Sequence, residues 1–190
     1  RHLAEKIRPA ETTTVCHLNV EWAPVTDTVE GPNSRPGILG QGEPIPISAG
    51  LALKYEPFRA GDKWGPPWGT TWLHLTATVP PEHRDDHLEM IVDLGGVWDS
   101  PGFQSEGLVV RPDGSVIKAL NPRNTWIPVE TDTEGHIDVY VEAASNPILL
   151  AQPPFQPTEG GDKLTASTEK YYSLKRADLV VVNDEVRELI

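Results

Sequence analysis

The residues that could support chemistry in this chain are a His-x-Asp pair, several loop carboxylates and a cluster of tryptophans. The pair lies in Gly135-His136-Ile137-Asp138 and could supply half of a metal site. It opens an alternating segment in which His136 and Asp138 fall on the polar face. We therefore expect a solvent-exposed strand face here, and we assign no metal ligand and no catalytic residue.

Four carboxylates close to predicted loops were considered as a catalytic pair, because glycoside cleavage uses two carboxylates. They are Asp93, Asp99, Glu106 and Asp113. The position of Asp113 is explained by a turn, and Glu106 can simply begin a strand. No spacing distinguishes an acid from a nucleophile, so an independent enzyme is the least favoured of the functions considered.

Three tryptophans lie within residues 64–72, together with two prolines and two glycines. Prolines fix the backbone and glycines permit unusual angles, so the segment up to Gly69 predicts a rigid aromatic turn. Aromatic rings of this kind commonly fill a core, but their flat faces also suit stacking on a sugar. Both interpretations stay open. The candidate contacts to a sugar or to a neighbouring domain are Trp64, Trp68, Trp98, Arg123 and Asn124.

Composition excludes several classes of partner. The 190 residues carry a net charge of −12, whereas non-specific binding to nucleic acid or to an anionic membrane needs clustered positive charge. No apolar run approaches the length of a membrane helix. Cys16 is the single cysteine, so an internal disulfide is impossible and a reducing compartment is compatible with the sequence.

The segment 72–79 shows the clearest strand pattern. Leu73, Leu75 and Val79 share one face, and Trp72 lies on the other. If the leucine face points to the core, Trp72 points away from it. A tryptophan is costly to leave in water. We therefore expect Trp72 to be covered by a proline-rich arm, by the preceding turn or by another domain.

Short strands separated by turn residues predict an all-β fold, a β-sandwich of the jelly-roll (galactose-binding-like) type. Arg111-Pro112-Asp113-Gly114 predicts a hairpin turn. Residues 179–182 are apolar on both faces and are predicted to be central in a sheet. The predicted strands are residues 14–22, 51–55, 72–79, 87–94, 106–110, 115–120, 125–129, 136–143 and 171–182.

Changes in composition suggest three parts. Residues 1–46 contain a short helix and a Pro/Gly-rich arm, residues 47–182 form the sandwich, and residues 183–190 begin a helix. Residues 146–161 are predicted to be a loop. The chain begins at Arg1 and ends within the predicted helix, so we expect it to be a piece of a longer protein.

Five segments occur in one order between residues 57 and 190, and together they resemble a known domain. They resemble the N-terminal domain of the α-mannosidases of glycoside hydrolase family 38, in the branch with cytosolic and bacterial enzymes. The segments are Trp64-Gly65-Pro66-Pro67-Trp68-Gly69-Thr70-Thr71-Trp72-Leu73-His74-Leu75 with Val79-Pro80, Glu106-Gly107-Leu108-Val109 with Asp113-Gly114, Asn121-Pro122-Arg123-Asn124, Tyr140-Val141-Glu142-Ala143-Ala144-Ser145-Asn146, and Ala177-Asp178-Leu179 with Glu188-Leu189.

The resemblance implies a jelly-roll sandwich that precedes an α/β catalytic domain, in which His and Asp residues hold zinc and an Asp is the nucleophile. The family's metal motif contains Gly-His-Ile-Asp followed by a Trp-Leu-Trp-like segment. Here Gly135-His136-Ile137-Asp138 continues into Val139-Tyr140-Val141-Glu142. We therefore carry over no zinc ligand, and we expect no cofactor in this fragment and zinc in the absent catalytic domain.

The resemblance also implies a role. The parent would be a cytoplasmic, retaining α-mannosidase that hydrolyses α-linked mannose from glycans, and the fragment alone would be inactive. The domain would pack against its own catalytic domain or support a homo-oligomer. The alternative is a carbohydrate-binding module that uses exposed tryptophans.

Overall fold

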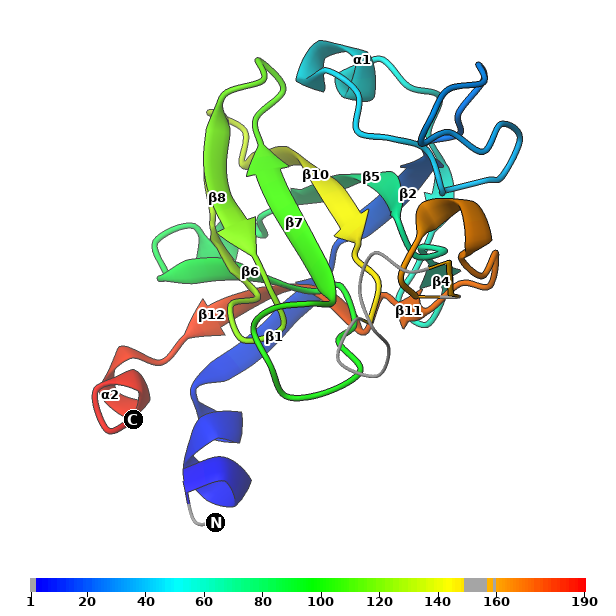
Figure 1. Cartoon of the computed structure of the whole chain (residues 1–190). Helices are drawn as coiled ribbons and strands as arrows, with labels where there is room; N and C mark the ends of the chain where they lie inside the picture. The colour runs from blue at the N-terminus through cyan, green and yellow to red at the C-terminus, as the bar shows by residue number, and fades with distance from the viewer. Residues whose placement is uncertain (1–2, 149–156, 159) are drawn as a thin grey trace.

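Strands dominate the computed structural model of this chain, which describes residues 3–148, 157–158 and 160–190 (Figure 1). They form antiparallel sheets, which confirms the predicted all-β fold. The strands are β1 (Thr12–His17), β2 (Asn19–Pro24), β3 (Glu56–Phe58), β4 (Lys63–Trp64), β5 (Gly69–Thr78), β6 (Leu88–Asp93), β7 (Ser105–Val110), β8 (Val116–Leu120), β9 (Trp126–Pro128), β10 (His136–Ser145), β11 (Tyr172–Ser173) and β12 (Arg176–Val182).

The sandwich has two layers. One sheet has four strands in the order β1-β12-β6-β9, and the other has six in the order β3-β2-β5-β10-β7-β8. A small pair, β11-β4, lies beside them. The helical segments are short: η1 (Leu3–Ile7), η2 (Arg8–Ala10), α1 (Ile47–Leu51), η3 (Pro81–His83), η5 (Lys163–Thr165) and α2 (Asp184–Arg187). Within the described ranges, none of the helices is long and apolar enough to span a membrane.

The main core fills the space between the two large sheets, and alternation along the central strands builds it. On β10, Ile137, Val139 and Val141 are buried, as predicted. Val139 pairs with Leu75 on β5, and Val141 pairs with Leu73, so the buried faces coincide. Since side chains alternate along a strand, this register directs the apolar half of both strands toward the four-stranded sheet.

A second apolar group, which we call the outer cluster, contains Ala23, Val25, Trp72 and Val110. Trp72 is completely buried there, away from the main core, which confirms the predicted direction and burial of its side chain, but its cover is a helix that the sequence did not predict. The cover is α1: a Cβ added to Gly50 would lie 2.2 Å from the Trp72 ring.

The covering helix corrects one prediction. Residues 51–55 were predicted as a strand, but Leu51 ends α1 and Leu53 lies in the turn that follows it. The nearby strand is β3, which begins only at Glu56. Leu51, Leu53 and Tyr55 do alternate, but they pack onto the outer cluster rather than onto a sheet. The alternation of apolar residues was identified correctly, but it was assigned to a strand where the structure has the end of a helix and a turn.

Two predicted strands are each divided in the structure. Residues 14–22 contain β1 and β2, which belong to different sheets and separate at Leu18. Leu18 is buried, and its N–H donates to Ala177 O (2.9 Å), so the chain crosses between layers without leaving the core. Residues 171–182 contain β11 and β12. β12 lies between β1 and β6, which confirms the predicted central position of residues 179–182.

The predicted hairpin is confirmed. β7 and β8 pair antiparallel across the turn, with Gly107 opposite Leu120. Arg111 N donates to Ser115 O (2.9 Å), and Gly114 adopts a φ of 85°. A positive φ is what glycine accommodates most easily, as the turn prediction required.

Residues 25–46 carry no strand, but β1 and β2 precede them, so the sandwich begins before the predicted boundary at residue 47. This arm is fixed by polar contacts. The Lys163 ammonium, only 6% exposed, contacts Asp27 (3.0 Å) and Glu43 (2.6 Å). Arg35 donates to the Lys163 carbonyl (3.1 Å). Of the predicted loop 146–161, residues 149–156 and 159 lie outside the described residues.

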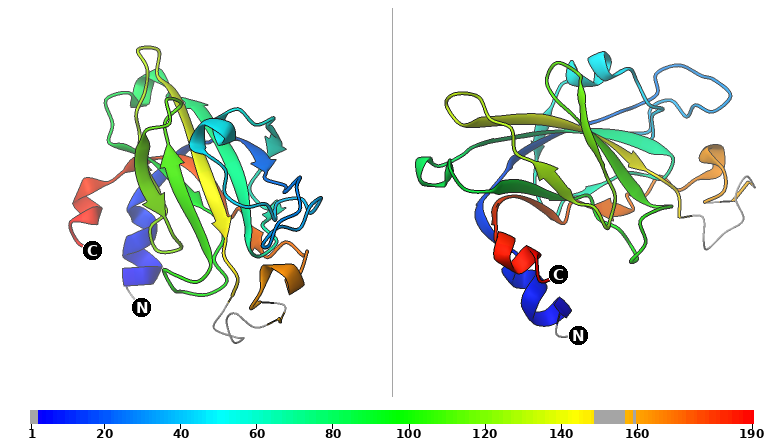
Figure 2. Two further views of the ribbon diagram at one scale, coloured as in Figure 1. Left: turned by 45° about the horizontal axis from the view of Figure 1, so that its top comes forward. Right: turned by 90° about the vertical axis from the view of Figure 1, so that its left-hand side faces the viewer.

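The two ends of the described chain lie on the same side of the sandwich (Figure 2). Asn183 caps α2, since its side chain accepts from Val186 N (3.2 Å), which agrees with the helix predicted from residue 183. Arg187 then binds Glu89 through two hydrogen bonds (2.8 and 2.9 Å) and Glu11 through a third (2.8 Å). The exit helix is therefore fastened both to β6 and to Glu11, the residue that precedes β1.

Candidate functional site

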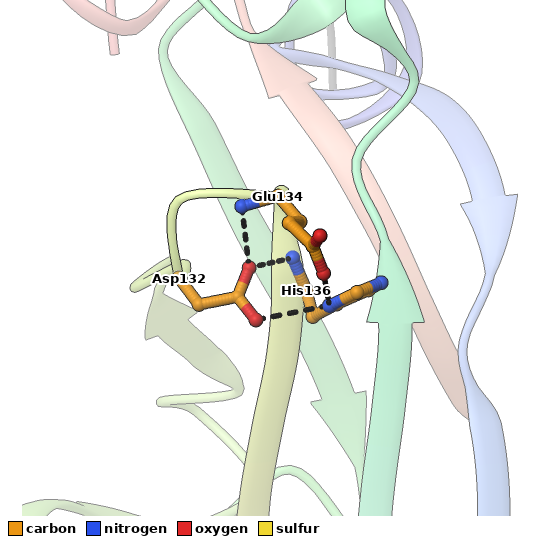
Figure 3. Close-up of side chains that lie close together, drawn as sticks. All are labelled: Asp132, Glu134 and His136. Atoms are coloured by element: carbon orange, nitrogen blue, oxygen red, sulfur yellow. Dashed lines mark hydrogen bonds and ion pairs between the residues drawn. The ribbon is translucent and has the colours of Figure 1, made fainter.

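The His-x-Asp segment lies at the start of β10, next to a tight turn (Figure 3). His136 Nδ1 is 2.9 Å from Asp132 Oδ2 and 3.6 Å from Glu134 Oε2. One potential ligand atom from each of these residues lies within 4.8 Å of the others. Asp138 is not part of this group, because its carboxylate contacts His74 Nε2 at 2.8 Å.

The hydrogen bonds of this group are those of a turn. Asp132 Oδ1 accepts from the backbone N–H groups of Glu134 (2.8 Å) and His136 (2.9 Å), and Gly135 takes a φ of 86°. The bond from the His136 backbone is the largest cause that lowers the pKa of Asp132. All three side chains are exposed. Turn formation thus explains the position of the Asp132 carboxylate without a metal ion.

The other loop carboxylates have structural partners as well. Asp93 Oδ1 accepts from Gly95 N (2.9 Å), and Asp113 Oδ1 accepts from Ser115 N (2.8 Å). Asp99 binds Arg123. Glu106 differs from these three, since it is exposed at the rim of a cavity. Three of the four carboxylates therefore serve local structure, and Glu106 is the one of the four that borders a cavity of about 500 Å³.

Trp64 lies in the main core. It is 1% exposed, its ring packs against Tyr172 (5.3 Å between centroids), and its Nε1 donates to Leu94 O (2.8 Å). A buried ring with a satisfied N–H has no face available to a sugar. Of the two interpretations of the aromatic turn, the structure therefore assigns core packing to this residue.

Trp98 and Arg123 are brought close to each other through Asp99. Arg123 Nε donates to the Asp99 carboxylate (2.9 Å) and Nη2 to its carbonyl (2.9 Å). Trp98 and Asp99 line a small hollow of about 260 Å³. Trp98 is half-buried, and its Nε1 is buried without a hydrogen-bond partner among the described residues.

Asn124 serves a separate local structure. Its Oδ1 accepts from Lys118 Nζ (2.8 Å), and this ammonium lies 3.5 Å from the centroid of the Trp126 ring. Burial is the main cause that lowers the pKa of Lys118. Asn124 thus positions a cation over an aromatic ring between β8 and β9.

Trp68 is the predicted site residue that borders a sizeable cavity. The cavity has a volume of about 500 Å³, and Phe103 and Glu106 line it together with Trp68. We call it the Trp68–Phe103 cavity. Phe103 was not among the predicted site residues. The one sequence signal was its place in a loop rich in glycine, serine and proline, which does not indicate where the ring points.

Comparison with known proteins agrees with the fold. Residues 36–180 match the family described as "Alpha-mannosidase, jelly roll domain". Alpha-mannosidase 2C1 of Homo sapiens is 29% identical over 154 residues, which cover 78% of this chain and 13% of the human protein. The Mus musculus protein of the same name is 25% identical over 154 residues, with the same coverage.

Alpha-mannosidase G of Dictyostelium discoideum is 25% identical over 153 residues, covering 77% of this chain and 13% of that protein. The chain thus matches a small part of each relative. The family match extends from within the arm to Val180, so it includes β3 to β11 and most of β12. Since it covers most of the chain, and since the resemblance seen in five segments points the same way, this chain belongs to the jelly roll domain family of α-mannosidases, as an N-terminal domain of the glycoside hydrolase family 38 type.

Proposed function

We propose that this chain is the non-catalytic N-terminal domain of a zinc-dependent, retaining α-mannosidase, and that it packs against the catalytic domain of the same polypeptide. The observation that carries the proposal is the match of residues 36–180 to a jelly roll domain within relatives of which the chain covers 13%. The zinc, the nucleophile and the hydrolysis of α-linked mannose from glycans belong to the catalytic domain, and we place the whole enzyme in the cytoplasm.

The exit helix supports a fixed arrangement of the two domains. Arg187 binds the Glu89 carboxylate in a bidentate manner, and the Glu89 side chain is only 5% exposed. Hydrogen bonds with Glu89 are the largest cause that raises the pKa of Arg187. A bidentate pair of this kind restricts orientation as well as distance. α2 therefore has one direction relative to the sandwich, and a domain that follows it is held in that direction.

An exposed apolar residue just after the exit helix offers a contact for the domain that we propose follows it. Leu189 is 71% exposed, which is unusual for a large aliphatic side chain. We assign it to the contact with the catalytic domain. Packing between copies of the chain is the other use of such a surface, and sedimentation of the 190-residue chain distinguishes the two, because it stays monomeric if the surface serves the catalytic domain.

Two assays test the proposal. The purified 190-residue chain is expected to release no aryl group from an aryl α-mannoside, with or without added zinc. A polypeptide that continues through the catalytic domain is expected to hydrolyse it. Turnover by the short chain that disappears in His136→Ala would contradict the proposal.

The packing role is tested in the longer polypeptide. Arg187→Ala and Leu189→Asp are expected to shorten the half-life of the mannosidase activity on heating. The matched control is Arg59→Ala, which removes an arginine whose side chain is 87% exposed and whose ion pair is long (3.9 Å). Equal half-lives for Arg187→Ala and Arg59→Ala would show that the exit helix does not fix the domains.

A further inference from the structure

Two strained aromatic residues line the same cavity. Among the described residues, Trp68 (φ 64°) and Phe103 (φ 58°) are the non-glycine residues with positive φ. Bulky side chains disfavour this conformation, and such residues cluster at binding sites, where the surrounding structure enforces them. They are 35 positions apart in the sequence, yet both border the Trp68–Phe103 cavity of about 500 Å³. That volume is in the range of small-molecule sites.

A buried serine holds the Trp68 side of the cavity. Ser145 is 1% exposed, and its Oγ donates to Pro66 O (2.6 Å) and accepts from Gly69 N (3.2 Å). Its carbonyl accepts from Trp68 N (2.9 Å). The Trp68 ring is oriented by a hydrogen bond from Nε1 to Gly160 O (3.3 Å). The turn that carries Trp68 is thus fixed at both its backbone and its ring.

A buried amide holds the Phe103 side. Gln104 is completely buried; its Oε1 accepts from Val97 N (2.8 Å), and its Nε2 donates to Ser100 O (2.6 Å). Asn146, next to Ser145, donates to the Gln104 carbonyl (2.9 Å) and joins the two supports. Despite this support, Phe103 remains 57% exposed. A strained aromatic ring that gains little from packing indicates a ligand.

The polar groups of the cavity indicate the class of ligand. Glu43, Glu106 and Asn146 line it, and its described lining contains no lysine or arginine. Glu43 is held in place by Lys163 at 2.6 Å. Carboxylates accept hydrogen bonds from hydroxyl groups and repel anions. Aromatic faces beside hydroxyl acceptors match a ring that is apolar on one face and hydroxylated at its edge.

We propose that the Trp68–Phe103 cavity binds a neutral hexopyranoside, with the sugar ring against Phe103 and Trp68 and its hydroxyl groups donating to Glu106 and Glu43. The proposal does not rest on the role of the domain in an α-mannosidase. A chain that binds no sugar can still pack against a catalytic domain, and a chain that binds sugar can fail to do so, so the two sets of experiments fail separately.

The test is an NMR titration of the ¹⁵N-labelled 190-residue chain with methyl α-mannopyranoside, methyl β-glucopyranoside and methyl β-galactopyranoside. At least one is expected to shift the Trp68 indole N–H signal in a saturable way. Phe103→Ala is expected to weaken binding at least tenfold, and Glu106→Gln severalfold. Trp126→Ala is the matched control, because Trp126 is an aromatic residue of similar exposure (43%) outside the cavity, and it should leave affinity unchanged.

Three results would overturn the proposal. One is the absence of saturable shifts with all three glycosides, and another is equal affinity in Phe103→Ala and the parent chain. The third is binding of glucuronate as tight as that of the neutral sugar, since the carboxylates should repel it. Trp68→Phe provides a second variant that keeps a ring, and it should retain part of the affinity that Trp68→Ala loses.

Backbone strain gives an independent readout. Phe103→Gly removes the unfavourable φ of a side-chain-bearing residue at an exposed position, so it should abolish binding without lowering the melting temperature. A marked loss of thermal stability in this variant would show that the Phe103 ring serves the fold. The positive φ of Phe103 would then no longer indicate a ligand.

Discussion

Trp64 and Trp72 are both completely buried, but they lie in two apolar regions that are built differently. Trp64 belongs to the main core, which two sheets enclose, and its Nε1 is bonded to Leu94 O. Trp72 belongs to the outer cluster, which the single turn of α1 covers, and its Nε1 has no hydrogen-bond partner among the described residues. Equal burial therefore does not imply equal constraint. The main core lies between two hydrogen-bonded sheets, whereas the outer cluster is covered by one short helix.

The largest expected effect is that of Trp64→Ala. Truncating a buried tryptophan costs about 3–5 kcal/mol of unfolding free energy, and the cost depends on how far the site can collapse. We expect Trp64→Ala near the upper end and Trp72→Ala near the lower end, because α1 can settle into the vacated space. Urea denaturation of both variants measures the difference. A greater loss for Trp72→Ala would reverse the comparison.

The next effect concerns the helix that covers Trp72. A Cβ at position 50 would lie 2.2 Å from the Trp72 ring, so Gly50→Ala must displace α1. Overpacking of this kind typically costs about 1–3 kcal/mol. Hydrogen exchange should accelerate in residues 47–51 and remain unchanged in β10.

The control for this variant is Gly102→Ala, because a Cβ there would meet nothing within 4 Å and the residue has no positive φ. It should match the parent chain in stability and exchange. If Gly50→Ala also matched the parent, α1 would not be packed on Trp72 as described.

Substitution of each tryptophan by phenylalanine separates the contribution of the hydrogen bond to stability from the contribution of burial. Trp64→Phe leaves the Leu94 carbonyl without its donor, which costs about 1–3 kcal/mol for a buried group. Trp72→Phe removes an N–H that has no partner, so its loss should be smaller despite the same change in volume. Thermal unfolding of the two variants tests this, and equal losses would mean that the Trp64 hydrogen bond contributes nothing net.

The smallest expected effect on stability is that of lowering the pH, which acts on the contacts of Asp27 in the arm that leads to α1. Burial opposes ionisation of Asp27, but hydrogen bonds from the Glu43 backbone and from Lys163 outweigh it, so the pKa of Asp27 lies below its ordinary value of 3.8. A lowered pKa stabilises the fold above pH 3.8 and ceases to do so as the pH falls through the folded-state value.

Unfolding free energy measured from neutral pH to below pH 3.8 should therefore fall more steeply in the parent chain than in Asp27→Asn. Asp85→Asn, which changes an exposed carboxylate, should follow the parent curve. Parallel curves for the parent and Asp27→Asn would show that the arm is not held by this carboxylate.

Much of the fold was predictable because alternation and turn residues are local signals. The central strands, the hairpin at Gly114 and the outward direction of Trp72 all follow from spacing along one segment. The helix α1 was not predictable, because Leu51 and Leu53 alternate as they would in a strand, and the packing of the helix depends on the contact of Gly50 with Trp72. The crossing at Leu18 is equally invisible, since both sides of it are strands.

The candidate site was predictable only in part. Trp68 was identified from its aromatic turn, but the same signal also marked Trp64, which lies in the core. Local sequence cannot separate them, because burial depends on what the sheets bring together. Phe103 was not predicted, because its place beside the cavity depends on a loop held by Gln104, a polar residue whose complete burial no pattern indicates.

The fastening of the two ends also determines how the domain responds to force. Thr12 at the start of β1 pairs with Val182 at the end of β12, and Arg187 joins Glu11 just beyond that pair. Tension applied between the ends therefore loads the Arg187–Glu11 contact first. Because the strands are antiparallel and enter the ladder at the same end, their hydrogen bonds then open in succession rather than all at once. The force that separates the two ends is therefore expected to be small, because only a few hydrogen bonds carry the load at any moment, even though the core itself lies between two sheets.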